Sequence, residues 1–233
     1  NNAIFPDVDM LMNNIVAVTS HIRKKLEAAG TPDIDRKVLH FVPCKDGKYY
    51  FVHDEKYWRV MDFIPDTVSK SSVTPKSSYI VGETFGDFQA MLADIPVELG
   101  ETIKDFHNIE FRLQQFKEAV AADKAGRVAE TKDIIDEIEK RADSMCRSEQ
   151  LFREGKLPKR ICHCDTKVDN ILFDQDDSKC SVSSTLTRLC LASYSRTTAT
   201  SSVRLPTPCP KIAPNTTRFS SAWTFSKHLP KVI

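Results

Sequence analysis

The amino-acid composition of this chain changes abruptly after Asp177. All 32 Asp and Glu residues lie in residues 1–177, whereas residues 178–233 contain none and hold 8 Lys or Arg and 20 Ser or Thr. Since soluble proteins use about 12% acidic residues, a run of this length without one is rare. Only residues 1–177 therefore have the mixture of apolar and charged side chains that is typical of a globular domain.

Residues 1–66 are predicted to form one helix followed by antiparallel strands. Apolar residues recur at spacings of three and four between residues 7 and 29, which predicts an amphipathic helix. Three short apolar segments separated by turn residues predict an antiparallel meander: 38–43, 49–53 and 57–63. Segment 63–66 contains Pro65 and interrupts this pattern, so we expect a hinge between two lobes there.

Residues 67–177 are predicted to be mainly helical. Three segments have helical periodicity: 77–92, 108–122 and 127–155. Acidic and basic residues alternate in the third segment, which indicates a solvated face rather than a nucleic-acid-binding surface. Residues 178–233 show neither helical nor strand periodicity, and their composition predicts a disordered basic tail.

Partners and location are limited by further features of the sequence. No apolar run approaches the roughly 20 residues that span a bilayer, so we expect no membrane association. No charged segment followed by an apolar one opens the chain, and seven Cys residues fit no disulfide framework. Both features favour a cytoplasmic location.

The clearest functional motif is the octet His163-Cys-Asp165-Thr-Lys167-Val-Asp-Asn170. The spacing H-x-D-x-x-x-x-N is that of a phosphotransfer loop, in which the Asp accepts a proton from a hydroxyl and the Asn holds a metal ion. A cation at Lys167 would stabilise negative charge that develops during the transfer. Apolar runs flank the octet, so a strand-loop-strand arrangement is expected.

This motif, with a meander and helices before it, gives the chain a resemblance to the aminoglycoside phosphotransferase-like small-molecule kinases. Within them the chain looks most like the bacterial N-acetylhexosamine 1-kinases. The resemblance covers about residues 1–177, and the octet is joined by four supporting segments: 13–26, 57–60, 85–89 and 101–108.

The resemblance implies an α+β, protein-kinase-like fold with two lobes. Residues 1–66 would be a partial N-lobe, residues 67–177 an incomplete helical C-lobe, and residues 178–233 a tail of non-native appearance. The expected reaction transfers the γ-phosphate of ATP or another nucleoside triphosphate, with Mg²⁺, to the anomeric hydroxyl of an N-acetylhexosamine. No nucleic-acid partner is expected.

The resemblance also implies roles for individual residues. Asp165 corresponds to the catalytic base and, with Asn170, to the nucleotide–metal site, in which Asn170 is the magnesium ligand. Lys167 would lie near the transferred phosphoryl group. His107 and Asn108 are candidate contacts to the sugar.

The chain departs from this family at both ends of the resemblance. The strands and phosphate-covering loop that precede the first helix in the family are not found, and neither is the metal-binding I-D-x-D segment after the catalytic loop. One codon choice for residues 183–192, read from the third base, gives I-D-F-D-T-L-M-P-G. We therefore expect a chain truncated at its N-terminus, frameshifted after about residue 177 and impaired in activity. Stop codons in the alternative frame would refute the frameshift.

Two other functions remain open. A choline-, homoserine- or aminoglycoside-type kinase is compatible with the net charge of −7 on residues 1–177, which hold 25 basic and 32 acidic residues. A non-catalytic, pseudokinase-like binding module would use the basic tail to bind anionic partners. A substrate panel separates the kinases, and salt-dependent binding that is lost on deleting residues 178–233 would identify the module.

Overall fold

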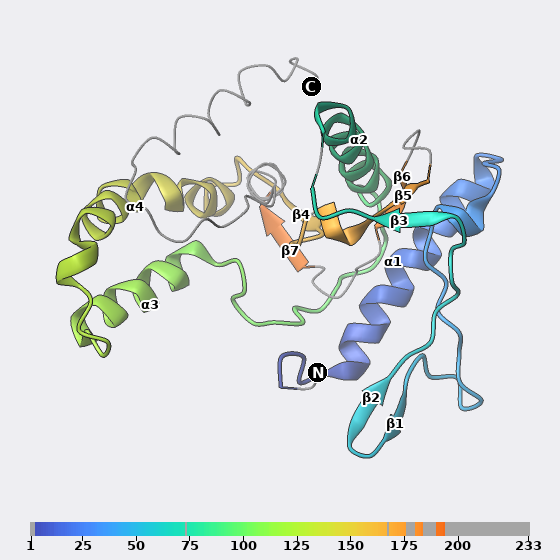
Figure 1. Ribbon diagram of the computed structural model, residues 1–233, viewed down its shortest axis with the longest axis horizontal. Coiled ribbons are helices and arrows are strands. Elements are labelled where there is room, and N and C mark those ends of the chain that lie inside the picture. The colour runs from blue at the N-terminus through green and yellow to red at the C-terminus, as the bar shows by residue number, and fades with distance from the viewer. Residues whose placement is uncertain (1–2, 73, 167, 176–179, 184–189, 194–233) are drawn as a thin grey trace.

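The computed structural model describes residues 3–72, 74–166, 168–175, 180–183 and 190–193. In these residues long helices are combined with short strands, and every strand pair is antiparallel (Figure 1). The expected α+β class is therefore confirmed. No helix in this part of the chain is long and apolar enough to cross a membrane.

Helix α1 (Val8–Ala28) forms where the spacing of apolar residues predicts it. The side chain of Asp7 accepts a hydrogen bond from the Met10 backbone N–H at 2.8 Å and so caps the first turn. The helix ends before Gly30, whose φ of 61° is a conformation that glycine adopts without steric cost. These local signals explain why the bounds agree with the prediction.

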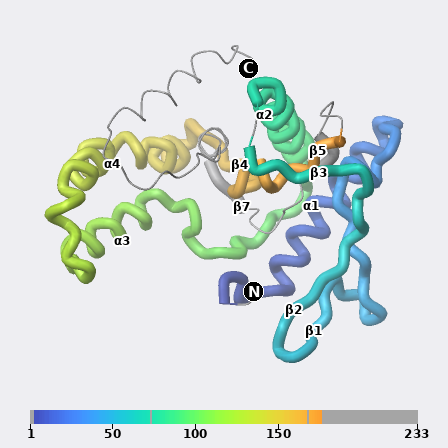
Figure 2. The backbone as a smooth tube through the Cα atoms, in the orientation of Figure 1, coloured from blue at the N-terminus to red at the C-terminus, as the bar shows by residue number. Residues whose placement is uncertain are grey.

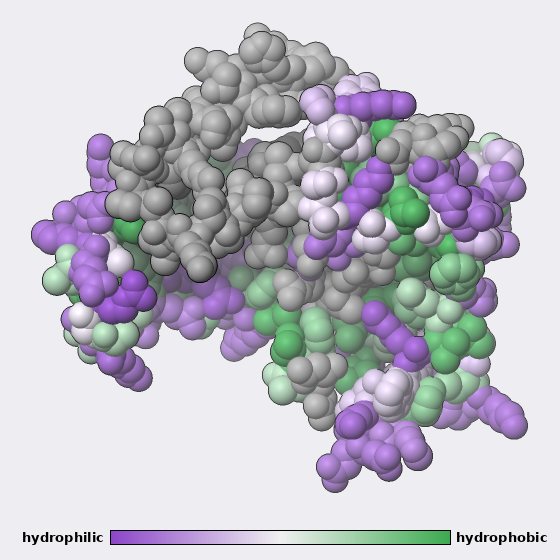
Figure 3. Space-filling view, in the orientation of Figure 1, coloured by the Kyte–Doolittle hydropathy of each residue, from purple (hydrophilic) through white to green (hydrophobic). Residues whose placement is uncertain are grey.

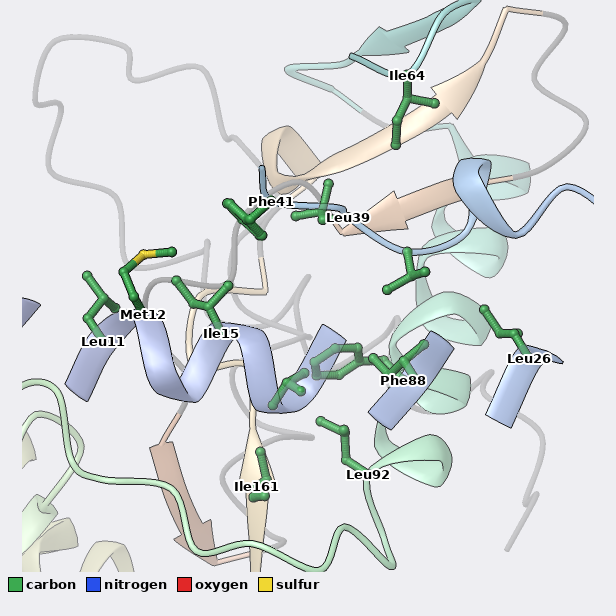
Figure 4. Packing of buried hydrophobic residues seen from close by; sticks show 13 residues of the cluster. Leu11, Met12, Ile15, Leu26, Leu39, Phe41, Ile64, Phe88, Leu92 and Ile161 are labelled. Atoms are coloured by element: carbon green, nitrogen blue, oxygen red, sulfur yellow. The ribbon is translucent and has the colours of Figure 1, made fainter. Parts of the chain in front are cut away.

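The main hydrophobic core lies around α1. Figure 4 shows Ile15 and its neighbours on this helix between the segment that carries Leu39 and Phe41 and the residues Phe88 and Leu92. Ile15 is fully buried, and its complete removal from water contributes about 2–3 kcal/mol. The cluster contains these buried residues: Leu11, Met12, Ile15, Val18, Ile22, Leu26, Val38, Leu39, Phe41, Ile64, Phe88, Leu92 and Ile161.

The predicted meander is only partly correct. Strands β1 (Phe51–His53) and β2 (Lys56–Trp58) form a hairpin whose turn residues, Asp54 and Glu55, both have positive φ, as a type I′ turn requires. Segment 38–43 forms no strand and makes a single bridge from Phe41 to Met61. Val38, Leu39 and Phe41 of this segment are buried in the core around α1, so these side chains pack against the helix rather than on a sheet face.

Apolar side chains are also exposed on this part of the molecule. Figure 3 shows hydrophobic surface on the side that carries α1 and the hairpin. The exposed large hydrophobic residues between positions 42 and 63 are Val42, Phe51, Val52, Tyr57, Trp58, Val60, Met61 and Phe63. A surface of this kind favours association with other molecules.

The expected hinge at residues 63–66 leads into a strand that the sequence did not predict. Strand β3 (Thr67–Ser69) pairs with β5 (Ile171–Asp174) in antiparallel register. Arg36, in the short helix η1 (Ile34–Arg36), donates to the Pro65 carbonyl at 2.6 Å and to Asp174 Oδ1 at 2.8 Å. One guanidinium thus connects the N-terminal part of the chain to both the hinge and β5.

The three predicted later helices are present. They are α2 (Pro75–Met91), α3 (Ile109–Ala122) and α4 (Lys132–Arg153), with the short helix η2 (Ala129–Thr131) before α4. Helices α3 and α4 lie side by side at the end of the molecule away from the β1–β2 hairpin (Figures 1 and 2). Arg153 of α4 forms a bidentate ion pair with Glu110 of α3, with N···O distances of 3.0 and 2.8 Å.

The segment after Asp177 contains two short strands that its composition did not indicate. Strand β6 (Cys180–Ser183) pairs with β5, and β7 (Cys190–Ser193) pairs with β4 (Lys159–Cys162). Strands of four residues, C-S-V-S and C-L-A-S, are too short for a clear period of two, which explains the error. The rest of the predicted disordered tail lies outside the described residues.

Replacing Asn14 by Ala is expected to lower the free energy of unfolding by about 1–3 kcal/mol. The buried amide of Asn14 donates to the Gly100 carbonyl at 2.7 Å and accepts from the Gly100 N–H at 3.0 Å, so Ala leaves two backbone groups without these bonds. Urea denaturation measures the change. The exposed neighbour Asn13 is the matched control, and Asn13→Ala should change stability by less than about 0.5 kcal/mol. Equal effects of the two substitutions would contradict the prediction.

Candidate active site

The octet lies between two strands, as the flanking apolar runs predict. Strand β4 ends at Cys162, and β5 begins at Ile171 directly after the short helix η3 (Val168–Asn170). The two strands belong to different sheets, because β4 pairs with β7 while β5 lies between β3 and β6. The loop therefore connects two sheets and does not close a simple hairpin.

The structure brings Asp165 and Asn170 together. Asn170 Nδ2 donates to the backbone carbonyl of Asp165 at 2.8 Å, and both side chains are largely buried, with 6% and 7% of the residue surfaces exposed. This bond closes the loop across five residues. Lys167, the third residue proposed from the motif, lies outside the described residues.

His163 lies in a buried position beneath the loop. Only 1% of its surface is exposed, and its ring lies edge-on to Phe85 and Phe88 of α2, with centroid distances of 5.5 and 5.8 Å. Edge-to-face contacts of this kind stabilise buried aromatic groups. The position suits a residue that supports the loop on α2.

His107 contacts the loop directly. Its Nε2 lies 3.1 Å from the carbonyl oxygen of Cys164, the residue before Asp165. A carbonyl oxygen only accepts hydrogen bonds, so Nε2 carries the proton and donates. Cys164 has a φ of 58°, in the left-handed region that residues other than glycine rarely adopt.

Asn108 caps α3. Its Oδ1 accepts from the Phe111 N–H at 3.2 Å, and its Nδ2 donates to Asp105 Oδ1 at 2.8 Å. An Asn before the first helical residue is among the strongest N-caps. Its side chain therefore holds the start of α3 in place one residue after His107.

Two residues that hold the ends of the loop were not proposed from the sequence. Gln89 of α2 donates from Nε2 to the Ile161 carbonyl at 3.0 Å, and Ser69 of β3 donates from Oγ to the Asp169 carbonyl at 3.1 Å. Gln89 belongs to segment 85–89, which carries part of the resemblance, so a signal for it existed. No local pattern marks Ser69, because its partner is 100 residues away.

The donor set of the loop fits a magnesium ion. Mg²⁺ prefers oxygen ligands and is commonly held by one or two protein groups together with phosphate oxygens and waters. The Asn170 bond to the Asp165 backbone uses the amide nitrogen, so Oδ1 is the atom that would hold the metal. No cluster of three or more His, Cys, Asp or Glu suited to a metal occurs in the described residues.

Charged groups also surround β5, the strand that follows the loop. Asp174 at its end pairs with Arg36 at 2.8 Å, and both side chains are about 30% exposed. Phe173 lies on the same strand, and the Nζ atom of Lys70, the residue after β3, lies 4.9 Å from the centroid of its ring, within the range of a cation–π contact. Two basic residues, Arg36 and Lys70, thus contact the strand after the loop, and Arg36 also contacts the hinge through the Pro65 carbonyl.

Comparison with known protein families gives an independent result. Residues 41–182 match the phosphotransferase enzyme family (APH). The matched region includes β4, the octet and β5, together with His107 and Asn108. Since the match covers more than half of the residues of this chain, the chain belongs to the phosphotransferase enzyme family.

Proposed function

We propose that this chain transfers the γ-phosphate of ATP, or of another nucleoside triphosphate, to a hydroxyl group of a small metabolite. The observation that carries the proposal is the loop inside the family match, in which Asp165 and Asn170 are held together by a hydrogen bond of 2.8 Å. Family membership supports the class of reaction. The nucleotide would lie between the proposed lobes, residues 1–66 and 67–177, and the reaction would take place in the cytoplasm.

In the proposed mechanism the Asp165 carboxylate orients the acceptor hydroxyl and takes its proton. The acceptor oxygen then bonds to the γ-phosphorus while the bond from this phosphorus to the β-phosphate oxygen breaks and the nucleoside diphosphate leaves. Asn170 Oδ1 would hold the magnesium ion, which when bound would neutralise part of the phosphate charge. We propose that the side chain of Lys167 provides a second positive charge near the transferred phosphoryl group.

The proposed acceptor is an N-acetylhexosamine, phosphorylated at its anomeric hydroxyl. This assignment depends on the resemblance carried by the supporting segments, one of which, 101–108, contains His107 and Asn108. Both residues lie at the start of α3, and His107 contacts the loop that carries Asp165. A position beside the base is where an acceptor must bind, which supports assigning this segment to the sugar site.

Turnover by this chain is expected to be slow. The family match ends at residue 182, close to Asp177, after which acidic residues disappear. We propose that residues 178–233 derive from a frameshifted reading of a phosphotransferase C-lobe, and that a second acidic metal ligand is lost with it. Without that ligand the charge of the nucleotide phosphates is less well neutralised.

A panel of acceptors tests the proposed function. We expect magnesium-dependent transfer of radiolabelled γ-phosphate to N-acetylglucosamine or N-acetylgalactosamine, and much less transfer to choline, homoserine or an aminoglycoside. Preference for the cationic acceptors would replace the sugar with the alternative suggested by the net charge of −7 on residues 1–177. No transfer to any acceptor, with salt-sensitive binding to anionic polymers, would favour the non-catalytic module.

A further inference from the structure

The two peptide groups on either side of the Asp165 α-carbon are both held by side chains. His107 donates to the carbonyl of Cys164 at 3.1 Å, and Asn170 donates to the carbonyl of Asp165 at 2.8 Å. These carbonyls belong to consecutive peptide planes, and each plane is rigid. Fixing both planes leaves the Asp165 side chain little freedom beyond its own rotamers.

The first of these planes needs such support. Cys164 has a φ of 58°, which is unfavourable for a residue with a side chain and persists only where surrounding contacts maintain it. The Cys164 thiol donates to the Cys162 carbonyl at 3.4 Å, a weak bond. The His107 contact comes from a strong donor in a distant segment, 57 residues away.

His107 is itself well fixed. Its ring lies edge-on to that of Phe106 with centroids 4.4 Å apart, and the next residue, Asn108, caps α3 and bonds to Asp105. Arg112 of α3 donates twice to the Phe106 carbonyl, at 3.2 and 3.1 Å. The start of α3 is therefore a rigid support from which the imidazole reaches the loop.

We infer that His107 is a positioning residue, which holds the Cys164–Asp165 peptide and thereby the carboxylate of the base. The part of this inference that concerns catalysis rests on the proposed function, whereas the contact itself does not. A sugar-contacting His107 would act on the substrate, but a positioning His107 acts on the loop whether or not substrate is present. The two roles can therefore be separated without measuring turnover.

The chemistry of the contact selects the test variants. The amide nitrogen of Gln reaches about as far as imidazole Nε2 and is also a donor, whereas the amide of Asn corresponds to Nδ1 and Ala has no donor. If the bond from Nε2 is what matters, His107→Gln keeps it and both His107→Asn and His107→Ala lose it.

Pulse alkylation of cysteines, resolved by peptide mass, measures whether the loop opens. Cys162 and Cys164 are buried, with 2% and 8% of their surfaces exposed, and trypsin releases both in one peptide, 161–167. We expect His107→Ala and His107→Asn to speed alkylation of this peptide by about fivefold, which corresponds to the loss of one hydrogen bond, while His107→Gln stays near the parent rate. The half-buried Cys44 and Cys146 are internal references whose rates should not change.

Two results would overturn the inference. Equal alkylation rates in the parent chain and all three variants would show that the bond does not hold the loop. A rate for His107→Gln as high as that for His107→Ala would show that the donor at Nε2 is not responsible. The alkylation rates can be measured even if this chain transfers no phosphate. The test of this inference is therefore independent of the test of the proposed function.

Where phosphate transfer is measurable, kinetics give a second readout. Loss of positioning lowers kcat and leaves KM for the sugar nearly unchanged, because the substrate contacts remain. Loss of a sugar contact raises KM, and Gln would not be expected to restore it. A rise in KM for the sugar without a change in the alkylation rate would therefore show that His107 contacts the sugar and does not position the loop.

Discussion

Replacing Asp165 by Asn is expected to lower the rate of phosphate transfer by about 10²–10⁴-fold, the usual contribution of a general base. Asn has nearly the same size as Asp but cannot accept the proton of the acceptor hydroxyl. The buried position of Asp165 and the bond from Asn170 to its backbone carbonyl hold the loop in place independently of the carboxylate charge. The loss should therefore appear in kcat, with stability little changed.

Transfer of radiolabelled γ-phosphate to an N-acetylhexosamine measures the effect, with long incubations because slow turnover is expected. The loop supplies a matched control, Asp169, whose side chain is exposed and whose contact with Ser69 is made through the backbone. Asp169→Asn should leave the rate within about twofold of the parent, as expected for a surface substitution outside the reacting groups. Equal losses in the two variants would show that Asp165 is not the base.

The second large effect concerns stability. Phe173→Ala should lower the free energy of unfolding by about 3–5 kcal/mol, the cost of removing a large aromatic side chain from a packed core. Phe173 is fully buried at the centre of β5 and packs in a small cluster with Phe85, Val168 and Ile171. Because Val168 lies in the octet, the cavity would loosen the loop between β4 and β5 as well as the strand.

Urea denaturation of Phe173→Ala measures this loss. Val68 is the control, since it is the register partner of Phe173 on β3 but is 36% exposed. Val68→Ala should cost less than about 1 kcal/mol, because little apolar area is lost from the core. A cost for Val68→Ala equal to that of Phe173→Ala would mean that the pairing of β3 with β5, rather than the cluster around Phe173, controls stability.

The helices and the loop position of the octet were predictable because their signals are local. Helix α1 follows from apolar spacing within a single segment, with Asp7 at one end and Gly30 at the other, and α3 begins at the cap residue Asn108. The octet is recognised from eight consecutive residues, so a loop between two strands could be predicted without knowledge of the rest of the fold. The structure confirms this prediction.

The strand pairing was not predictable in the same way. Segment 38–43 has the pattern of a strand, yet most of its apolar residues are buried in the core around α1, and its strand-like pairing is the single bridge from Phe41 to Met61. Strand β3 has three residues and no clear pattern, yet it pairs with β5 about 100 residues later. A pattern of alternating residues indicates which side chains can share a face, but it does not name the partner strand.

In the candidate site, too, some features could be predicted from the local sequence and others depend on long-range contacts. Asp165, Lys167 and Asn170 could be proposed from the order of residues alone, because a short loop keeps near neighbours close in space. The contacts of His107, Gln89 and Ser69 with that loop depend on segments 57 to 100 residues distant, which meet only when the helices pack. Spacing along the chain determines that the candidate residues Asp165 and Asn170 lie together. Long-range packing decides which side chains hold them, because the free energy of those contacts comes from the whole core and not from any one segment.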